Sequence, residues 1–395
     1  MQKAAAEAAV VVTKRAIYRW ATASQWVFLM AFGASLQAAV LPEDRADVMY
    51  HSYDGGDITI DGPAVLVRKG VTDDISVSAQ YYVDEISSAS IDVMVVASPY
   101  TEERTEYTVG ADYLINKTII SAGYTNSSEN DYEADTYSLG VSQDFFGDLS
   151  TLSLGFAYGS DEVGMSTDPT FEEPAEHRSY QLSWSQVVTK NLIMNFIYHV
   201  ITDEGFLRNP YRWVRFDNGD GTFSTESEHY PETRTSQAVA VRGKYFMPYR
   251  AAFSFEYRRY DDTWKINGYN LDVGYIHPIG ENWILEFDYR YYKQSAAEFY
   301  SDLFDAPGTG GRDFRARDKE LSDFETNSYS ATISYEFDIP WTRWLEKGSV
   351  NLAWTHIRFD YNNFRDATQT QFAAGEEPLY NMDADVVRFF ISTWF

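Results

Sequence analysis

The amino-acid sequence predicts an all-β fold: one transmembrane antiparallel β-barrel of about 16 strands, with long outer loops and short periplasmic turns. Three observations carry this prediction. The chain ends on an apolar strand, period-two segments fill the sequence from Arg45 onward, and the connections between these segments alternate in length. Each observation is weak alone, and together they favour a barrel over a soluble β-sandwich.

The final stretch, Asp385–Phe395, alternates with the period of a β-strand. One face would carry Val387, Phe389, Ile391, Thr393 and Phe395, and the other Arg388, Phe390, Ser392 and Trp394. This ending resembles the terminal-aromatic signal of outer-membrane barrels, although Thr393 stands where an aromatic residue is common. The last strand of such a barrel pairs with the first, which removes both open edges. We therefore expect barrel closure and membrane insertion to depend on Phe389, Ile391, Trp394 and Phe395. A buried last strand of a soluble sandwich is the alternative.

Composition narrows the class of protein. The chain has 395 residues, no cysteine, 16% aromatic residues and a formal net charge of -27. The aromatic content suits two girdles around a barrel, and the mean hydropathy of -0.38 argues against a helical membrane protein. The acidity argues against nucleic-acid binding, which needs a basic footprint. The absence of cysteine excludes disulfides and thiolate metal sites.

Residues 1–38 predict a secretory signal segment, and residues 39–395 predict a single outer-membrane barrel domain. Basic Lys14, Arg15 and Arg19 precede a short apolar run over residues 26–34, and Leu36-Gln37-Ala38 offers a cleavage site. The run is too short to span a bilayer comfortably. We expect export, cleavage and insertion into a Gram-negative outer membrane; a retained anchor is the alternative.

The predicted strands mostly run about 10 to 13 residues, long enough to cross a membrane at a tilt. They are Arg45–Tyr53, Ile58–Lys69, Ile75–Glu85, Arg104–Ile115, Thr118–Asn126, Asp135–Phe145, Leu149–Ser160, Arg178–Val188, Asn191–Thr202, Thr235–Met247, Ala251–Asp261, Trp264–His277, Trp283–Lys293, Asn327–Phe337, Ser349–Asp360 and Asp385–Phe395. Alternation alone fits a sandwich equally well.

The connections separate the two folds, because short and long ones alternate as periplasmic turns and outer loops do. The long ones are Ile86–Glu103, Asp161–His177, Asp203–Arg234, Ser295–Thr326 and Asn362–Ala384. They hold acidic pairs such as Glu102-Glu103 and Glu172-Glu173, which we expect in solvated outer loops. One long connection, Asp338–Gly348, falls on the periplasmic side, where Trp341 and Trp344 are expected at the membrane interface.

Charged residues recur on the inward parity of four successive predicted strands. This charge ladder comprises Arg242, Lys244, Glu256, Arg258, Asp272, Glu286, Asp288 and Arg290. Opposite charges on adjacent strands can pair across about 4.8 Å. In a lumen they would brace the wall or line a path for polar solutes, and both interpretations stay open. Arg388 on the final strand, and Arg104 with Glu106 and Asp112, extend the same mixed polarity, so strong ion selectivity is not expected.

Motifs for other chemistry are weak or missing in the sequence. The six histidines show no metal-ligand spacing, and no nucleophile elbow, phosphate loop or dinucleotide fingerprint occurs. We therefore predict no catalytic residue, no metal and no cofactor. His199, on the inward parity, would need a nearby Ser or Asn to act in a hydrolase. Asp217–Gly221 has glycines where a calcium loop needs oxygen ligands, which favours a tight turn.

Several segments also point to a known family. They are Glu43–Asp47, Gly62–Lys69, Ser87–Asp92, Ser128–Asp135 and Arg317–Ser322. With these segments the chain resembles an uncharacterised bacterial family of predicted outer-membrane β-barrels, domain of unknown function 3570. Members of that family are often encoded near a flavin transferase and small thioredoxin-like or lipoprotein partners. The resemblance therefore implies a barrel and an envelope redox setting, and it supplies no site residues.

Three functions remain open. The leading one is passive or weakly selective passage of small polar solutes, with the ladder and inward loops forming the constriction. The second is an accessory barrel that docks or houses a periplasmic or surface partner, such as an envelope lipoprotein or redox protein. The third is an outer-membrane hydrolase. The expected partners are the lipid bilayer and the barrel-assembly machinery, and no nucleic acid.

Overall fold

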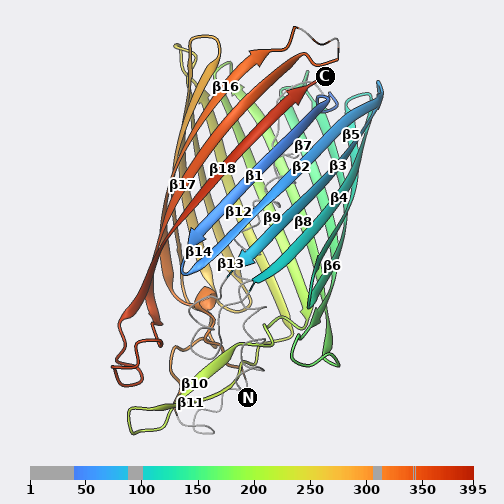
Figure 1. Ribbon diagram of the computed structural model, residues 1–395. Helices are drawn as coiled ribbons and strands as arrows, with labels where there is room; N and C mark the ends of the chain where they lie inside the picture. The colour runs from blue at the N-terminus through green and yellow to red at the C-terminus, as the bar shows by residue number, and fades with distance from the viewer. Residues whose placement is uncertain (1–39, 88–100, 306–313, 341, 343) are drawn as a thin grey trace.

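The chain folds into one closed antiparallel β-barrel in the computed structural model, which describes residues 40–87, 101–305, 314–340, 342 and 344–395 (Figure 1). Sixteen strands form the wall, in the order β1-β18-β17-β16-β15-β14-β13-β12-β9-β8-β7-β6-β5-β4-β3-β2. The fold class predicted from the sequence is confirmed. The predicted signal segment and Trp341 lie outside the described residues.

Most of the strands are longer than expected from the sequence. The wall consists of β1 (Arg45–Gly55), β2 (Ile58–Thr72), β3 (Ile75–Ser87), β4 (Thr101–Ile115), β5 (Thr118–Glu129), β6 (Tyr132–Phe145), β7 (Ser150–Gly164), β8 (Glu172–Thr189), β9 (Leu192–Gly205), β12 (Thr233–Phe246), β13 (Ala252–Asp262), β14 (Asn267–Ile279), β15 (Trp283–Gln294), β16 (Phe324–Asp338), β17 (Lys347–Arg365) and β18 (Leu379–Trp394). A separate hairpin outside the wall consists of β10 (Trp213–Asp217) and β11 (Phe223–Ser227).

The first and last strands close the barrel. β1 and β18 pair over the full length of β1, from Arg45 with Trp394 to Gly55 with Ala384. The Phe395 amide also donates to the Asp44 carbonyl at 3.3 Å. Closure satisfies the backbone groups of both end strands, which a bilayer interior requires. The start of β1 and the end of β18 therefore share one rim, the periplasmic rim of the prediction.

Alternate side chains along every wall strand differ in exposure. Large apolar residues on one parity are exposed on each of the sixteen strands, including Leu154 at 55% and Leu139 at 59%. In water such a continuous apolar surface would be strongly unfavourable, whereas in a bilayer it contacts hydrocarbon. The terminal residues follow this pattern: Phe389 and Ile391 are exposed on the outside, while Trp394 has the inward parity.

The two-residue turn between β1 and β2 shows how a hairpin is specified locally. Gly56 and Asp57 both have positive φ, at 62° and 65°. Two successive left-handed residues make the turn type whose twist matches a β-hairpin, and Gly and Asp are among the residues that tolerate it. This turn lies at the same end of the barrel as the long loops.

Three expectations about the outer end were wrong. The Asp203–Arg234 connection contains the β10–β11 hairpin, and the acidic pairs Glu102-Glu103 and Glu172-Glu173 lie on strands β4 and β8. β18 begins at Leu379, not at Asp385. The strands continue because ladder hydrogen bonds persist beyond the hydrocarbon, where charged side chains are tolerated. A sequence search for apolar alternation ends at the membrane surface.

Helical structure in the described residues is limited to one 3-10 turn, Lys319–Leu321. Within the described part of the chain, no helix is long and apolar enough to cross a membrane.

The sidedness of the wall predicts opposite outcomes for neighbouring substitutions on β7. Leu154→Arg places a charge against lipid and should lower the free energy of unfolding by about 2–4 kcal/mol. Ser153→Arg, the matched control on the inward face, should cost far less. Denaturant unfolding in detergent or lipid, followed by heat-modifiable electrophoretic mobility, measures both. Equal losses would contradict the assignment of faces.

Candidate functional site

The charge ladder lies together on the inward face of β12 to β15, as the sequence predicted. Arg242 donates to Glu256 at 2.6 Å, and Asp272 lies 3.6 Å from Arg290. Lys244 on β12 interacts electrostatically with two carboxylates of β15, those of Glu286 and Asp288. Arg258 is the remaining basic residue of the ladder, and it has no ion pair or hydrogen bond among the described residues. Most ladder charges thus neutralise a neighbour.

A second polar cluster stands on β1, β3 and β4, and sequence reasoning found only part of it. The Asp84 carboxylate accepts from Nε2 of His51 at 2.8 Å and pairs with Arg104 at 2.9 Å. The Tyr82 ring stacks on the imidazole, with centroids 4.9 Å apart. All of these side chains share the inward parity of their strands. Glu106 and Arg388, which the sequence did assign to the lumen, flank this cluster.

Gly62 explains how His51 on β1 reaches Asp84 on β3 across the intervening strand. Gly62 is in register with His51, and a Cβ there would lie 1.8 Å from the Val83 carbonyl and 3.3 Å from the imidazole. Only glycine allows this close approach. The Gly62-Pro63 step inside a predicted strand was the available signal, because both residues mark irregular strand positions.

Two sectors of the wall between these charged clusters are mostly neutral. β16 and β17 present hydroxyls, with Ser330 and Thr355 hydrogen-bonded at 2.9 Å. β8 and β9 present amides and hydroxyls, and Asn195 donates to Ser183 at 2.9 Å. In barrel order the sector centred on β13 and β14 lies roughly opposite the sector around β2 and β3. A solute in the lumen would therefore meet two charged walls separated by hydroxyl-rich ones.

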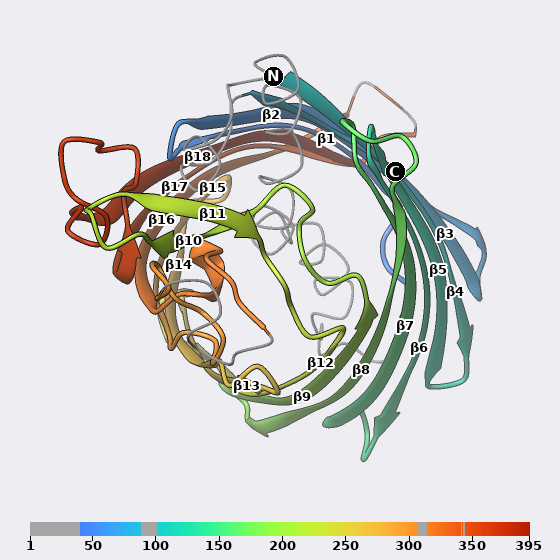
Figure 2. The same cartoon turned by 90° about the horizontal axis from the view of Figure 1, so that it is seen from below.

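The outer mouth is crossed by residues 206–232, here called the strap (Figure 2). Its first anchor is Tyr211, which is 1% exposed. The Tyr211 hydroxyl donates to Asp131 at 2.8 Å and accepts from the Ser166 amide at 2.6 Å. Asp131 follows β5 and Ser166 follows β7. This end of the strap is therefore fixed to the β5–β8 side of the rim.

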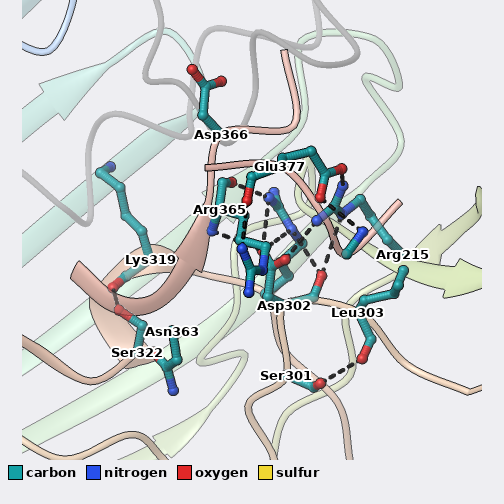
Figure 3. A network of polar contacts seen from close by, with 12 residues as sticks. Arg215, Ser301, Asp302, Leu303, Lys319, Ser322, Asn363, Arg365, Asp366 and Glu377 are labelled. Atoms are coloured by element: carbon teal, nitrogen blue, oxygen red, sulfur yellow. Dashed lines mark hydrogen bonds and ion pairs between the residues drawn. The ribbon is translucent and has the colours of Figure 1, made fainter. Parts of the chain in front are cut away.

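The second anchor is Arg215 on β10, a guanidinium that is 2% exposed (Figure 3). It donates to Asp302 at 2.6 Å and to Glu377 at 2.5 Å, so it joins the β15–β16 loop to the β17–β18 loop. Arg317 completes the network by donating to Asp302 at 3.0 Å. Burial alone would raise the pKa of Glu377, but the hydrogen bond from Arg215 holds that pKa below its ordinary value. The anchor is ionised at neutral pH.

The two anchors are four residues apart on the strap, but they hold it to loops that leave strands on opposite sides of the barrel. Asp131 comes just before β6, and Asp302 lies in the loop that leads into β16. In the barrel order, β6 and β16 are eight strands apart, which is half of the sixteen. Main-chain bonds support the crossing, from Asp217 to Phe304 at 2.9 Å and from Ala374 to Gly221 at 3.0 Å. An apolar core lies where the strap meets the rim, formed by residues that include Trp264, Tyr230 and Phe299. The Asp203–Arg234 and Ser295–Thr326 connections, which the sequence showed to be long enough to fold over the opening, thus contact each other at the mouth.

Asp217–Gly221 forms the tip of the strap hairpin. The Asp217 carboxylate accepts from the Gly219 amide at 2.8 Å, and Asp220 accepts from the Thr222 amide at 3.0 Å. Both carboxylates thus cap their own turn, which confirms the tight-turn interpretation.

Elsewhere on the rim, carboxylate oxygens of Glu102, Glu129 and Asp131 lie within 4.8 Å of one another. Asp131 already anchors the strap, so this cluster is part of the rim's polar framework.

His199 has the partner that the hydrolase hypothesis required. Its Nε2 lies 2.8 Å from the Ser179 hydroxyl, on the inward face of β8 and β9. No acid is hydrogen-bonded to His199 within the described chain. Gln181 is its register partner on β8, and the small Ala238 is its partner on β12. The pair has a nucleophile and a base without the orienting carboxylate of a triad.

His177 forms a three-strand clamp near the outer rim. Its two ring nitrogens lie 2.9 Å from Asp161 and 2.8 Å from Asp203. Glu176 and Arg178, on the opposite face, pair with each other, so this level of β8 lies beyond the hydrocarbon. Burial alone would lower the pKa of His177, but hydrogen bonds and charge from both carboxylates raise it to about 9.

The clamp predicts a loss of stability in alkali. The folded pKa lies above the ordinary value of 6.5, so the stabilisation is complete below about pH 6.5 and disappears as the pH rises through about 9. Discounted for partial exposure, it should contribute about 1 kcal/mol. Unfolding of the wild type should become easier between these values, and His177→Gln should remove that dependence. His229→Gln, on the exposed strap, serves as the control. An unchanged pH profile in His177→Gln would refute the clamp.

Comparison with known proteins identifies the family but no activity. Residues 91–179 and 166–346 match the family described as "Protein of unknown function (DUF3570)". No curated protein matches the sequence.

Solved structures with a similar fold include three barrels. A bacterial polysaccharide outer membrane secretin has 9% identity and a TM-score of 0.46, covering 91% of this chain and 99% of its own. The siderophore receptor PirA from Acinetobacter baumannii has 8% identity and a TM-score of 0.43, covering 90% and 60%. OmpT, an outer membrane protein of Vibrio cholerae, has 11% identity and a TM-score of 0.41, covering 89% and 100%. At TM-scores below 0.5 these likenesses carry no functional argument.

Proposed function

Because the chain belongs to the DUF3570 family, whose description supplies no activity, we propose from the geometry alone that it is an outer-membrane channel for passive, weakly selective passage of small polar solutes. The observation that carries this proposal is the polar inward face of a sixteen-strand wall. Barrels of about this strand number leave room for an aqueous channel. The outer-membrane setting follows from the apolar outer face of a closed β-barrel.

The charge balance of the ladder supports weak selectivity. Arg242, Lys244, Arg258 and Arg290 are matched by Glu256, Asp272, Glu286 and Asp288, so the formal sum is zero. A wall whose ladder charges sum to zero orders water and polar solutes without a strong preference for one sign. Export through a cleaved signal at residues 1–38 and insertion by the barrel-assembly machinery belong to the same proposal.

The strap would set the size limit of this channel. It lies over the mouth and is held to loops from opposite sides of the barrel, and its second anchor, Arg215, is part of a buried ion-pair network. Removing one partner of such a network leaves uncompensated buried charge and costs about 3–5 kcal/mol. The strap is therefore a rigid constriction, and releasing its second anchor should widen the entrance.

Planar-bilayer recording tests the channel directly. The purified full-length protein should give discrete current steps, and Arg215→Met should raise the unit conductance roughly twofold because the strap no longer covers its side of the mouth. Arg208→Met, which removes another strap arginine that stacks on Phe206, should leave conductance unchanged. Properly folded protein that never conducts would overturn the channel. A stoichiometric lipoprotein or redox partner, recovered from outer membranes, would then favour the accessory-barrel function.

A second candidate function is favoured by the Ser179–His199 pair. In a hydrolase the Ser179 hydroxyl would attack an ester carbonyl while His199 accepts its proton. The ester C–O bond then breaks, His199 returns the proton to the departing alcohol, and water later hydrolyses the acyl-serine to the free acid. Reconstituted protein should then hydrolyse a small water-soluble ester, and His199→Ala should reduce the rate by about a hundredfold or more. Ser183→Ala, elsewhere on the same inward face, is the control. Wild-type turnover no greater than that of empty liposomes would exclude this function.

A further inference from the structure

Three guanidiniums on the inward face of the described wall have no partner, although most charges there are paired. Arg68 lies near the periplasmic end of β2, where the charges of Asp47 and Asp112 act on it. The other two belong to Arg258 on β13 and Arg388 on β18. Neither forms an ion pair or a hydrogen bond within the described part of the chain. Both are on the inward parity, because neighbouring Tyr257 and Phe389 are exposed to the lipid side. Unpaired cations on an otherwise compensated wall are available to a solute.

Each of these arginines has a small register partner on one side. Arg258 is in register with Ala240 on β12, and Arg388 is in register with Ala353 on β17. A methyl group offers no competing hydrogen bond and leaves space above it for a ligand. The carboxylate nearest in sequence to Arg258 is Glu256, which Arg242 already holds. On its other side Arg388 is in register with His51, which is already hydrogen-bonded to Asp84.

The two positions also lie at matching depth. Arg258 is six residues from the periplasmic end of β13 (258 minus 252), and Arg388 is six from that of β18 (394 minus 388). Along the shorter arc between them, the wall carries the Asp272–Arg290 pair, the Glu286 and Asp288 carboxylates that interact with Lys244, and then the hydroxyls of β16 and β17. Free guanidiniums separated by a hydroxyl-rich wall suit a ligand with acidic groups and hydroxyls.

We propose that Arg258 and Arg388 form an anion-recognition pair that gives this channel a preference for small solutes bearing carboxylate or phosphate groups. This inference rests on the proposed channel function and goes beyond its weak selectivity by naming the favoured sign. Guanidinium binds both anion types through two parallel hydrogen bonds. The formal charge of -27 does not oppose this at the lumen. Many acids, such as Glu172 and Asp217, are at the outer end, and charge is screened within about 8 Å at physiological salt.

Reversal potentials across planar bilayers test the preferred sign. In a tenfold KCl gradient the wild-type channel should pass chloride over potassium by roughly threefold. The Arg258→Gln/Arg388→Gln double variant should lose this preference. Arg259→Gln removes the same charge from the neighbouring, outward-facing position and should change nothing. Retained heat-modifiable mobility shows that each variant is folded.

A second double variant distinguishes binding of anions by the guanidinium groups from simple attraction by positive charge. Citrate and inorganic phosphate should reduce the chloride current of the wild type. Arg258→Lys/Arg388→Lys should keep the chloride preference but weaken block by either anion roughly tenfold, because lysine lacks the planar fork. Block by citrate alone or phosphate alone would assign the ligand class.

Each outcome bears on one proposal or on both. Currents that favour potassium, or a double variant that behaves like the wild type, would overturn the anion pair and leave the channel intact. Absence of any current would overturn both. Chloride preference lost in the double variant and retained in Arg259→Gln would support both.

Discussion

Closure of the backbone hydrogen-bond ladder is the constraint on which the rest of this structure depends. A bilayer interior offers no water to an unpaired amide or carbonyl, so a spanning sheet must have no edge. Pairing of β1 with β18 meets that requirement. Once the sheet is closed, the alternation of side chains along each strand determines their surroundings. One set faces hydrocarbon, and the other faces an enclosed interior. The lumenal clusters and the strap exist because closure creates an inside and a mouth.

The polar contacts inside the barrel depend on small residues as much as on charged ones. Gly62 lets His51 and Asp84 meet across a strand, and Ala240 and Ala353 leave the space beside Arg258 and Arg388. At the mouth, the contacts depend on large buried polar side chains. There the strap is fixed by one buried tyrosine hydroxyl on one side and one buried guanidinium on the other. Because these two anchors tie the strap to loops from both sides of the barrel, the strap is a fixed part of the entrance.

Much of the wall could be predicted from the sequence, because lipid imposes a strict alternation on about ten residues per strand. The charge ladder was found for the same reason, since parity places Arg242 beside Glu256 once the strands are in register. Three kinds of feature could not be found. Strand ends beyond the membrane, such as Glu172 at the start of β8, follow hydrogen bonding and carry no apolar pattern. Contacts between distant loops, such as Arg215 with Glu377, have no local signal. The meeting of His51 with Asp84 depends on the absence of a side chain at Gly62, which lies between them on β2, and only the folded sheet shows this position.

The central claim is that one parity of each strand touches lipid and the other lines a water-accessible interior. The native chain has no cysteine, so single cysteines report their own surroundings without background. The decisive measurement is labelling of cysteines placed in turn at residues 328 to 334 of β16, in protein reconstituted into liposomes. A small water-soluble thiol reagent should label Ser328, Ser330 and Thr332 positions, and a lipid-soluble reagent should label Tyr329, Ala331 and Ile333 positions. Uniform labelling by either reagent, without alternation, would contradict the account.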